Sequence, residues 1–237
     1  MNTPIRVLIH GASGRMGQAL LRLAPEQAAV RVVAVVSRDP ERLSTVPGVH
    51  RLAASELVQA PDFDVAVDFS LPDGFDRILA LCVERGAALV SGTTGLEPGQ
   101  REALARASGG VPVLWASNFS LGVAVLNDLV ERAAHALKGW DCDIVESHHV
   151  HKLDAPSGTA LTLGEHARQG GTEPRYASLR AGDIVGEHLV QFTTLGERIE
   201  LVHRATNRDI FARGALHCAV RLVGRPAGSY RVRDLLD

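Results

Sequence analysis

The stretch Ile5–Gly17, IRVLIHGASGRMG, decides the fold. Ile5–Ile9 is a short, nearly continuous apolar run, the pattern of a parallel strand that is buried on both faces. A glycine-rich turn follows, and apolar residues then recur at helical spacing: Met16, Ala19, Leu20 and Leu23. A second apolar run, Val30–Val36, completes a strand–helix–strand unit within about 32 residues, the setting in which such a turn binds a dinucleotide.

The glycine spacing of this turn is G-x-x-G-x-x-G, which differs from the usual G-x-G-x-x-G of dinucleotide-binding turns. Glycines tighten the turn and let backbone amides approach a pyrophosphate at the helix start. The alternative is a tight strand-to-helix turn without a ligand. The context of two buried strands favours the dinucleotide.

The second strand ends in Ser37-Arg38, where an acidic residue usually bonds the adenosine ribose. A hydroxyl followed by a guanidinium suits a 2′-phosphate better than a ribose diol. The sequence therefore favours NADPH over NADH as the cofactor, with NADH possible. The alternative is that Arg38 is a solvated loop residue.

Three further strands are expected at Phe63–Phe69, Ala87–Val90 and Val111–Trp115, and each ends in small or polar residues. In open parallel sheets, ligands bind at the carboxyl ends of the strands. Loop chemistry would produce one or two such ends by chance, whereas three in succession indicate a binding edge.

After Asn118 the hydrophobic pattern changes. A longer amphipathic helix is expected to end near Lys138-Gly139, and two alternating strands, Glu187–Thr194 and Glu197–Arg204, are joined by a turn at Leu195-Gly196. The alternation predicts a second, mixed or antiparallel sheet with one exposed face, which indicates self-association or simple solvent exposure. A final helix, Phe211–Leu222, can return to the first domain.

The predicted fold class is therefore α/β: a Rossmann-like parallel-sheet dinucleotide-binding domain plus a smaller α+β domain for substrate and oligomerisation. The expected boundaries are 1–118 for the first domain, 119–207 for the second and 208–237 for the return segment. The links around Val46–Ser55 and after Gly170 look compact, and the chain looks short.

Composition limits the partners and the compartment. The chain has 237 residues, a net charge of -2 and 22% charged residues, so it carries no basic footprint for nucleic acid or an anionic membrane. Three isolated cysteines form neither a disulfide framework nor a metal site. With no apolar run of roughly 18 residues and no signal-like amino terminus, a cytoplasmic protein is expected.

The stretch Asp141–Leu161, DCDIVESHHVHKLDAPSGTAL, gathers most of the candidate chemistry. Its first half reads as a strand, in which Glu146 and His148 share a face, and His149 joins them only if the strand ends there. Ser157-Gly158-Thr159 then begins a helix, whose free amides beside cationic side chains form an anion receptor. The hypothesis is a site that binds a small carboxylate and gives it a proton.

Other interpretations of these residues stay open. The histidine pair could be structural or metal-binding, although no third ligand has the usual spacing, so no metal is expected. Histidine titrates near neutral pH and suits a general acid. Lys152 is either an anion partner or a solvated charge, and His151 is the least committed of the group. Asp154 either orients Lys152 or caps the helix.

Seven motifs occur in order along the chain: Gly11–Gly17 (GASGRMG), Asp68–Pro72 (DFSLP), Gly92–Gly95 (GTTG), Asn118–Gly122 (NFSLG), Glu146–His149 (ESHH), Asp154–Ala160 (DAPSGTA) and Arg180–His188 (RAGDIVGEH). Together they resemble the dihydrodipicolinate (4-hydroxy-tetrahydrodipicolinate) reductase family. The match runs from the first strand to the final helix. Its histidine-to-SGTA block is the most specific part.

The resemblance implies roles for individual residues. The pyrophosphate would lie at Gly11, Ala12, Ser13, Gly14, Arg15 and Met16, with Ser37 and Arg38 at the ribose. The nicotinamide side would be lined by Gly92, Thr93, Thr94, Ala116, Ser117, Asn118 and Phe119. His148 and Lys152 would donate the proton. The substrate carboxylates would bind at His149, Gly158 and Thr159, with Thr94 also at the substrate.

The implied reaction is hydride delivery from the nicotinamide to the ring carbon conjugated with an imine, after loss of water, followed by protonation. The implied assembly is a homotetramer built through the second sheet, with hinges near Asn118–Ser120 and Thr206–Arg208. Ser37 departs from the usual acid, which puts strong NADH use in doubt.

Two other classes compete: a different NAD(P)-dependent reductase, such as a semialdehyde or amino-acid dehydrogenase, and a non-catalytic dinucleotide sensor. No cysteine near a strand end is a plausible nucleophile for a semialdehyde dehydrogenase, and a sensor needs no proton-donating cluster.

Overall fold

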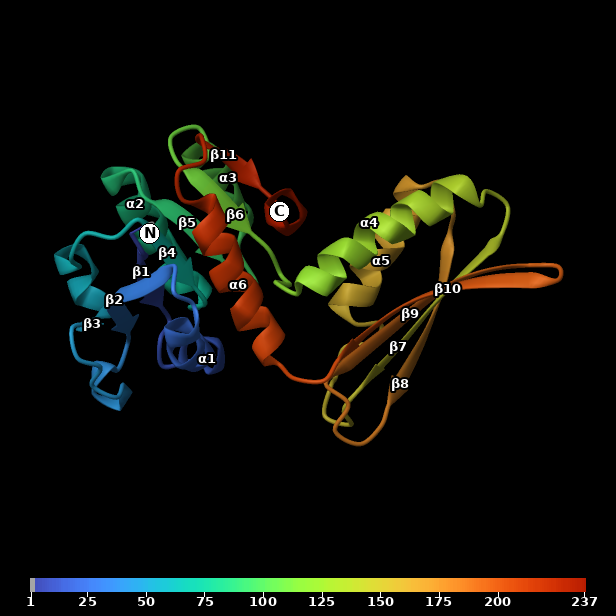
Figure 1. Cartoon of the computed structure of the whole chain (residues 1–237), viewed down its shortest axis with the longest axis horizontal. Helices are drawn as coiled ribbons and strands as arrows, with labels where there is room; N and C mark the ends of the chain where they lie inside the picture. Colours follow the sequence, from blue (N-terminus) through green and yellow to red (C-terminus); the bar gives the residue numbers. More distant parts are fainter. Residues whose placement is uncertain (1–2) are drawn as a thin grey trace. The chain divides into compact units, whose positions relative to one another are not determined.

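A parallel seven-stranded sheet, ordered β11-β6-β5-β4-β1-β2-β3, forms the centre of the first of two units in the computed structural model, which describes residues 3–237 (Figure 1). The strands are β1 (Ile5–His10), β2 (Val30–Ser37), β3 (His50–Ala53), β4 (Val65–Asp68), β5 (Ala88–Ser91), β6 (Pro112–Trp115) and β11 (Gly228–Tyr230). From β3 to β6 this is the order of the two halves of a Rossmann fold, with the topological switch between β1 and β4.

Helices cover both faces of this sheet. They are α1 (Arg15–Leu23), α2 (Pro72–Arg85), α3 (Pro98–Ala107) and α6 (Asp209–Leu222), with short 3₁₀ turns η1 (Ala24–Glu26), η2 (Pro40–Arg42), η3 (Ala54–Gln59) and η4 (Val232–Leu235). Helices α2 and α3 pack on the face that carries Leu8 and Leu89, and Phe75 and Ile78 of α2 are fully buried there. Helix α6 lies beside η1, where Arg213 pairs with Glu26 at 2.8 Å.

The buried strands follow from their sequence. Val7, Leu8 and Ile9 are each 0% exposed, so successive side chains of β1 are buried on both faces, as its continuous apolar run predicts. Helix α2 ends at Gly86, which adopts the left-handed conformation at a φ of 63°. This confirms the predicted stop.

A mixed four-stranded sheet, ordered β10-β9-β7-β8, organises the second unit. Its strands are β7 (Asp141–His148), β8 (Pro174–Arg180), β9 (Gly186–Thr194) and β10 (Glu197–Ala205), and its helices are α4 (Leu121–Ala136) and α5 (Gly158–Gln169). Strands β7 and β8 are parallel, and the other pairs are antiparallel. The two helices cover one face, where Val130, Ile144, Leu163 and Phe192 form a core.

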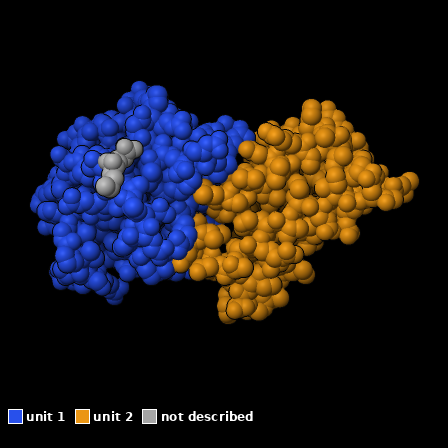
Figure 2. Space-filling view, in the orientation of Figure 1, with its two compact units in different colours: residues 1–119, 211–237 blue, residues 120–210 orange. Residues whose placement is uncertain are grey.

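The chain passes twice between the units. Unit 1 comprises the chain up to Phe119 together with Phe211–Asp237, and unit 2 comprises Ser120–Ile210 (Figure 2). Among residues 3–237, no helix combines the length and the apolar character needed to span a membrane.

The predicted fold class is confirmed, but the expectation of compact links is wrong in two places. Residues 46–55 contain β3, and the segment after Gly170 contains β8. Strand β3 has four residues, and Leu52 is its one buried side chain. Strand β8 is an edge strand with four exposed residues, so it lacks a clear apolar period. Helix α3 and strand β11 were also missed.

Replacing Gly17 in α1 should destabilise unit 1. A β-carbon there would lie 2.5 Å from the carbonyl oxygen of Gly11 and from Cα of Ala12, which are rigid backbone atoms. We expect Gly17→Ala to lower the free energy of unfolding by about 1–3 kcal/mol, measured by urea denaturation. The matched control is Gly99→Ala in α3, where a β-carbon meets nothing within 4 Å. Equal effects of the two substitutions would contradict the close packing.

Candidate active site

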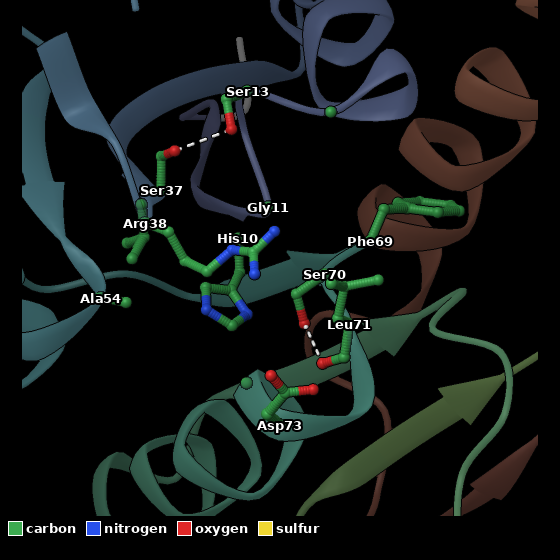
Figure 3. Close-up of a pocket in the computed structure, with 13 residues that line it drawn as sticks. His10, Gly11, Ser13, Ser37, Arg38, Ala54, Phe69, Ser70, Leu71 and Asp73 are labelled. Carbon is green, nitrogen blue, oxygen red and sulfur yellow. Dashed lines mark hydrogen bonds between the residues drawn. The ribbon is translucent and has the colours of Figure 1, made fainter. Parts of the chain in front are cut away.

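A pocket of about 240 Å³ lies in unit 1 at the carboxyl ends of β1, β2 and β4 (Figure 3). Its lining includes five of the residues predicted to bind the cofactor: Gly11, Ser13, Gly14, Ser37 and Arg38. The other walls come from His10, Ala54 and the loop that leads into α2. This position, beside the topological switch, is where ligands of open parallel sheets bind.

The turn between β1 and α1 is built for close approach of an anion. Gly11 has a φ of 79°, and a β-carbon there would lie 2.5 Å from the carbonyl oxygen of Phe69. Gly14 caps α1 without a side-chain hydrogen bond to the first-turn amides. Amides at the start of α1, aided by the helix dipole, therefore suit the pyrophosphate of a dinucleotide. The residues of this pocket fit the implied nicotinamide cofactor.

The end of β2 presents a hydroxyl and a guanidinium to the pocket. Ser37 Oγ donates to Ser13 Oγ at 2.7 Å and accepts from the backbone amide of Asp39 at 3.1 Å. The Asp39 carboxylate pairs with Arg42 at 3.1 Å. Arg38 reaches toward the centre of the pocket in Figure 3. Asp39, the acid that follows β2, is thus paired with Arg42. Arg38 presents its positive charge to the pocket.

A buried carboxylate, Asp68, joins this pocket to the end of β5. It is 0% exposed and accepts hydrogen bonds from His10 Nδ1, Ser91 Oγ and Thr93 Oγ1, each at 2.8 Å, and from the amide of Ser70 at 3.1 Å. Burial would raise the pKa of Asp68, but hydrogen bonds, chiefly from His10, lower it below its ordinary value. The ionised Asp68, at the end of β4, therefore holds His10 at the end of β1 and Ser91 and Thr93 at the end of β5.

Two of the residues expected on the nicotinamide side, Gly92 and Phe119, lie against Phe69. A β-carbon at Gly92 would lie 2.1 Å from the Phe69 ring, so only glycine fits. The Phe69 and Phe119 rings meet edge to face at 5.4 Å, and Trp115 Nε1 donates to the carbonyl oxygen of Thr93 at 2.8 Å. The other predicted cofactor residues do not line the described pocket: Ala12, Arg15, Met16, Gly92, Thr93, Thr94, Ala116, Ser117, Asn118 and Phe119.

In unit 2 a second buried carboxylate, Glu146, forms a hydrogen bond with His148, the predicted proton donor. Glu146 is 1% exposed and accepts from His148 Nδ1 at 2.5 Å, from Arg180 Nη2 at 2.7 Å and from the amide of Ser157 at 3.2 Å. Burial opposes ionisation, yet hydrogen bonds from Arg180, Ser178 and His148, with Arg180 the strongest, lower the pKa of Glu146 to about 2. Glu146 is therefore an anion at neutral pH.

His148 and Lys152 are each held by a carboxylate. Burial lowers the pKa of His148, with the charges of Lys152 and Arg180 adding to the effect, and Glu146 opposes this only in part. A β-carbon at Gly186 would lie 3.0 Å from His148 Nε2, so the glycine leaves room at that nitrogen. Lys152 Nζ donates to Asp154 at 2.7 Å. Both roles left open for Asp154 find support, because it pairs with Lys152 and a hydrogen bond from the Gly158 amide, at the start of α5, helps to lower its pKa.

Helix α5 begins at Gly158, as predicted, and Ser157 caps it by accepting from the amide of Ala160 at 3.2 Å. Ser157 Oγ also lies 3.1 Å from Nε2 of the buried His188, whose ring meets that of His148 edge to face at 5.2 Å. The helix start is thus packed directly against the histidine cluster.

His149 lies beyond the end of β7, which stops at His148. Its Nε2 accepts from Arg208 Nη2 at 2.9 Å, and its ring lies 6.2 Å from that of the exposed His151. Burial and the charge of Arg208 lower the pKa of His149. His149 is therefore paired with an arginine of the same unit.

The sequence interpretation missed four members of this cluster as functional residues: Glu146, Arg180, His188 and Arg208. Strand alternation did place Glu146 beside His148, which was the available signal. Arg180 reaches Glu146 because β8 pairs with β7 in parallel, and β8 was not predicted. Across residues 3–237, no three or more His, Cys, Asp or Glu side chains are grouped so as to hold a metal ion.

A Rossmann sheet with a glycine-lined anion site, in a chain with a second mixed-sheet unit, defines the class: nicotinamide-dependent oxidoreductases of two units. Residues 5–119 match the family described as dihydrodipicolinate reductase, N-terminus, and residues 122–236 match its C-terminus. The chain belongs to the dihydrodipicolinate reductase family.

Curated relatives agree over their whole length. The chain is 72% identical over 236 residues to the 4-hydroxy-tetrahydrodipicolinate reductase of Stenotrophomonas maltophilia strain R551-3, covering 99% of both chains. It is 66% identical over 237 residues to that of Xylella fastidiosa strain 9a5c, covering 100% of both. The expectation that the chain is short is therefore wrong for these relatives.

Solved structures share the fold at low identity. A dipicolinate-bound dihydrodipicolinate reductase from Paenisporosarcina sp. TG-14 superimposes with a TM-score of 0.81 at 22% identity, over 97% of this chain and 98% of that one. Aspartate semialdehyde dehydrogenase II from Vibrio cholerae reaches a TM-score of 0.59 at 13% identity, over 92% and 97%. The fold thus extends to other dehydrogenases.

Stability should depend on pH through His188. Burial lowers the pKa of His188 from 6.5 to about 4. Between these values the unfolded chain binds the proton and the folded chain does not, so the free energy of unfolding falls as the pH falls. His188 should contribute about 3 kcal/mol to this loss.

Urea denaturation of wild type and His188→Gln at several pH values from about 4 to 7 isolates this contribution, because other buried histidines are common to both proteins. The variant should show the shallower dependence. Parallel curves would show that His188 keeps an ordinary pKa in the folded protein.

Proposed function

We propose that this chain catalyses the reduction of 4-hydroxy-tetrahydrodipicolinate to tetrahydrodipicolinate, with loss of water, in diaminopimelate and lysine biosynthesis. The observation that carries the proposal is the 72% identity over 99% of both chains to a relative named for this activity. Both units match the corresponding parts of the reductase family. The histidine and lysine side chains at the end of β7, beside the start of α5, are the kind of groups that a dicarboxylate requires.

Unit 1 holds the nicotinamide dinucleotide, which supplies the hydride when it is bound. The amides of Gly11–Met16 bind the pyrophosphate, and Arg38 with Ser37 binds a 2′-phosphate, which makes NADPH the preferred cofactor and NADH the weaker one. Residues at the ends of β5 and β6 line the nicotinamide side: Gly92, Thr93, Thr94, Ala116, Ser117, Asn118 and Phe119. Asp68 keeps Thr93 in place.

Unit 2 binds the substrate carboxylates. The amides of Gly158 and Thr159 lie at the start of α5, where the helix dipole favours an anion. His149, paired with Arg208, supplies a second polar contact. Thr94 is assigned to the substrate as well. Two receptors of this kind match a substrate with two carboxylates.

His148 and Lys152 deliver the proton that completes the reduction. With Nδ1 of His148 bonded to the ionised Glu146, its Nε2 is the nitrogen that faces the substrate. Burial keeps the pKa of free His148 low. A bound dianion opposes that effect and charges the imidazole when it is needed. Lys152 lies close enough to influence His148 and is the second donor.

The outer face of the second sheet provides a surface for a homotetramer. Helices α4 and α5 cover the opposite face (Figure 1). Apolar side chains on the outer face include Leu179 and Val202, which are 56% and 42% exposed, and the less exposed Val145 and Leu189. An apolar sheet face of this kind is typical of subunit interfaces. The assembly and the cytoplasmic location belong to this proposal.

The central test is oxidation of NADPH, followed by absorbance, with freshly generated 4-hydroxy-tetrahydrodipicolinate. His148→Gln should lower kcat by about 100-fold or more, because glutamine cannot act as a general acid. His135→Gln, at an exposed position on α4, is the control and should keep wild-type turnover. Absence of NADPH oxidation by wild type, or full turnover by His148→Gln, would refute the assignment.

Cofactor preference tests Arg38. Loss of a charge-assisted hydrogen bond costs about 1.5–3 kcal/mol, so Arg38→Ala should raise the KM for NADPH roughly 10- to 100-fold and leave that for NADH little changed. Arg106→Ala, at an exposed pair with Glu102, is the matched control. Equal efficiency with both cofactors, unchanged in the Arg38 variant, is incompatible with a 2′-phosphate site.

A further inference from the structure

We propose that Glu146 and Arg180 are positioning residues for the reduction: the carboxylate sets which nitrogen of His148 can exchange a proton, and the guanidinium holds the Lys152 segment beside it. This inference rests on the proposed function and deepens it. Neither residue touches the substrate in this scheme. Each acts through a group that does.

The Glu146 carboxylate is shared by three elements that carry the proposed chemistry. Oε2 accepts from His148 Nδ1 at 2.5 Å and from Arg180 Nη1 at 2.9 Å, and Oε1 accepts from Arg180 Nη2 at 2.7 Å and from the amide of Ser157 at 3.2 Å. These donors belong to β7, to β8 and to the residue that caps α5. One 1%-exposed side chain therefore fixes the acid relative to the helix start that binds the carboxylate.

Arg180 extends the same connection to the lysine. Two of its nitrogens form a fork on Glu146, while Nε donates to the carbonyl oxygen of Lys152 at 3.3 Å and Nη2 donates to that of Asp154 at 2.6 Å. Only a guanidinium has enough donors in one plane to bind a carboxylate and a backbone segment at once. Arg180 thus connects the segment that contains Lys152 to the Glu146 carboxylate, which is hydrogen-bonded to His148.

The state of Glu146 dictates the tautomer of His148. The pKa of Glu146 lies at about 2, so its oxygens can only accept hydrogen bonds, and Nδ1 of His148 must carry the hydrogen. Nε2 remains for proton exchange. The negative charge also offsets part of the burial that lowers the pKa of His148. Without it, the imidazole could adopt either tautomer and would protonate less readily.

A second histidine–glutamate pair in unit 2 serves as a comparison for the His148–Glu146 pair. His166 Nδ1 lies 2.9 Å from Glu131 Oε2, between α5 and α4. That glutamate side chain is 39% exposed, against 0% for Glu146. Buried ion pairs are weak contributors to net stability, so the burial of the charged Glu146–Arg180 pair beside His148 indicates a role in function.

The test compares Glu146→Gln with Glu131→Gln in the full chain. Glutamine keeps the shape but removes the charge. We expect Glu146→Gln to lower kcat at neutral pH tenfold or more, with cofactor affinity unchanged. The alkaline fall of kcat should move about 1–3 pH units toward acid, because an opposite charge beside His148 is lost. Glu131→Gln should keep the wild-type kcat and pH profile.

Nitrogen-15 NMR of the NADPH-bound wild type supplies a readout that needs no Glu146 variant and no substrate. The His148 resonance, assigned by its loss in His148→Gln, should show the Nδ1–H tautomer at neutral pH. Arg180→Lys should keep this tautomer, because Glu146 remains, but should lower kcat/KM for the substrate tenfold or more by loosening the Lys152 segment.

The outcomes separate the two proposals. An Nε2–H tautomer in wild type, or a wild-type pH profile in a folded Glu146→Gln protein, overturns the positioning role. Wild-type kcat/KM in Arg180→Lys overturns the part assigned to arginine. If wild type does not oxidise NADPH with the substrate, the proposed function fails and the positioning role falls with it, whatever the tautomer. If Glu146→Gln does not fold, the tautomer and the Arg180→Lys kinetics decide.

Discussion

A carboxylate that is removed from water must receive hydrogen bonds, and each unit is arranged around one such group. In unit 1, Asp68 collects donors that follow three neighbouring parallel strands. In unit 2, Glu146 collects donors from two strands and from the residue that caps a helix. Because each donor is a candidate binding or catalytic group, or adjoins one, satisfying the buried charge also arranges the site.

Strand pairing in the two sheets brings these donors to the buried carboxylates. Parallel strands bring their carboxyl ends to one edge, so His10, Asp68 and Ser91 meet although they are distant in sequence. In unit 2, parallel pairing of β7 with β8 places Arg180 opposite His148, and antiparallel pairing with β9 places His188 opposite Glu146. Side-chain direction then follows from the two-residue period of a strand. The register therefore decides which polar groups can reach each carboxylate.

Much of the fold could be predicted because its signals are local. The apolar run of β1, the glycine turn and the periodicity of α1 are contained within about twenty residues, and α2 ends at Gly86 as expected. Elements whose stability comes from neighbours were missed. Strand β8 is exposed along most of its length, and β11 has three residues paired only with β6. Such strands exist because an adjacent edge offers hydrogen bonds, which no local pattern records.

By itself the sequence determined the parallel sheet and the glycine turn before α1, and it predicted an anion site there and a proton-donating histidine near a helix start. These depend on residue type and short spacing, and Glu146 and His148 share a strand face for that reason. Only the tertiary structure decided what those residues touch. It turned Asp39 toward Arg42, paired His149 with Arg208 and set Arg180 on Glu146. Burial and long-range register control those contacts, and both arise only when the chain has folded.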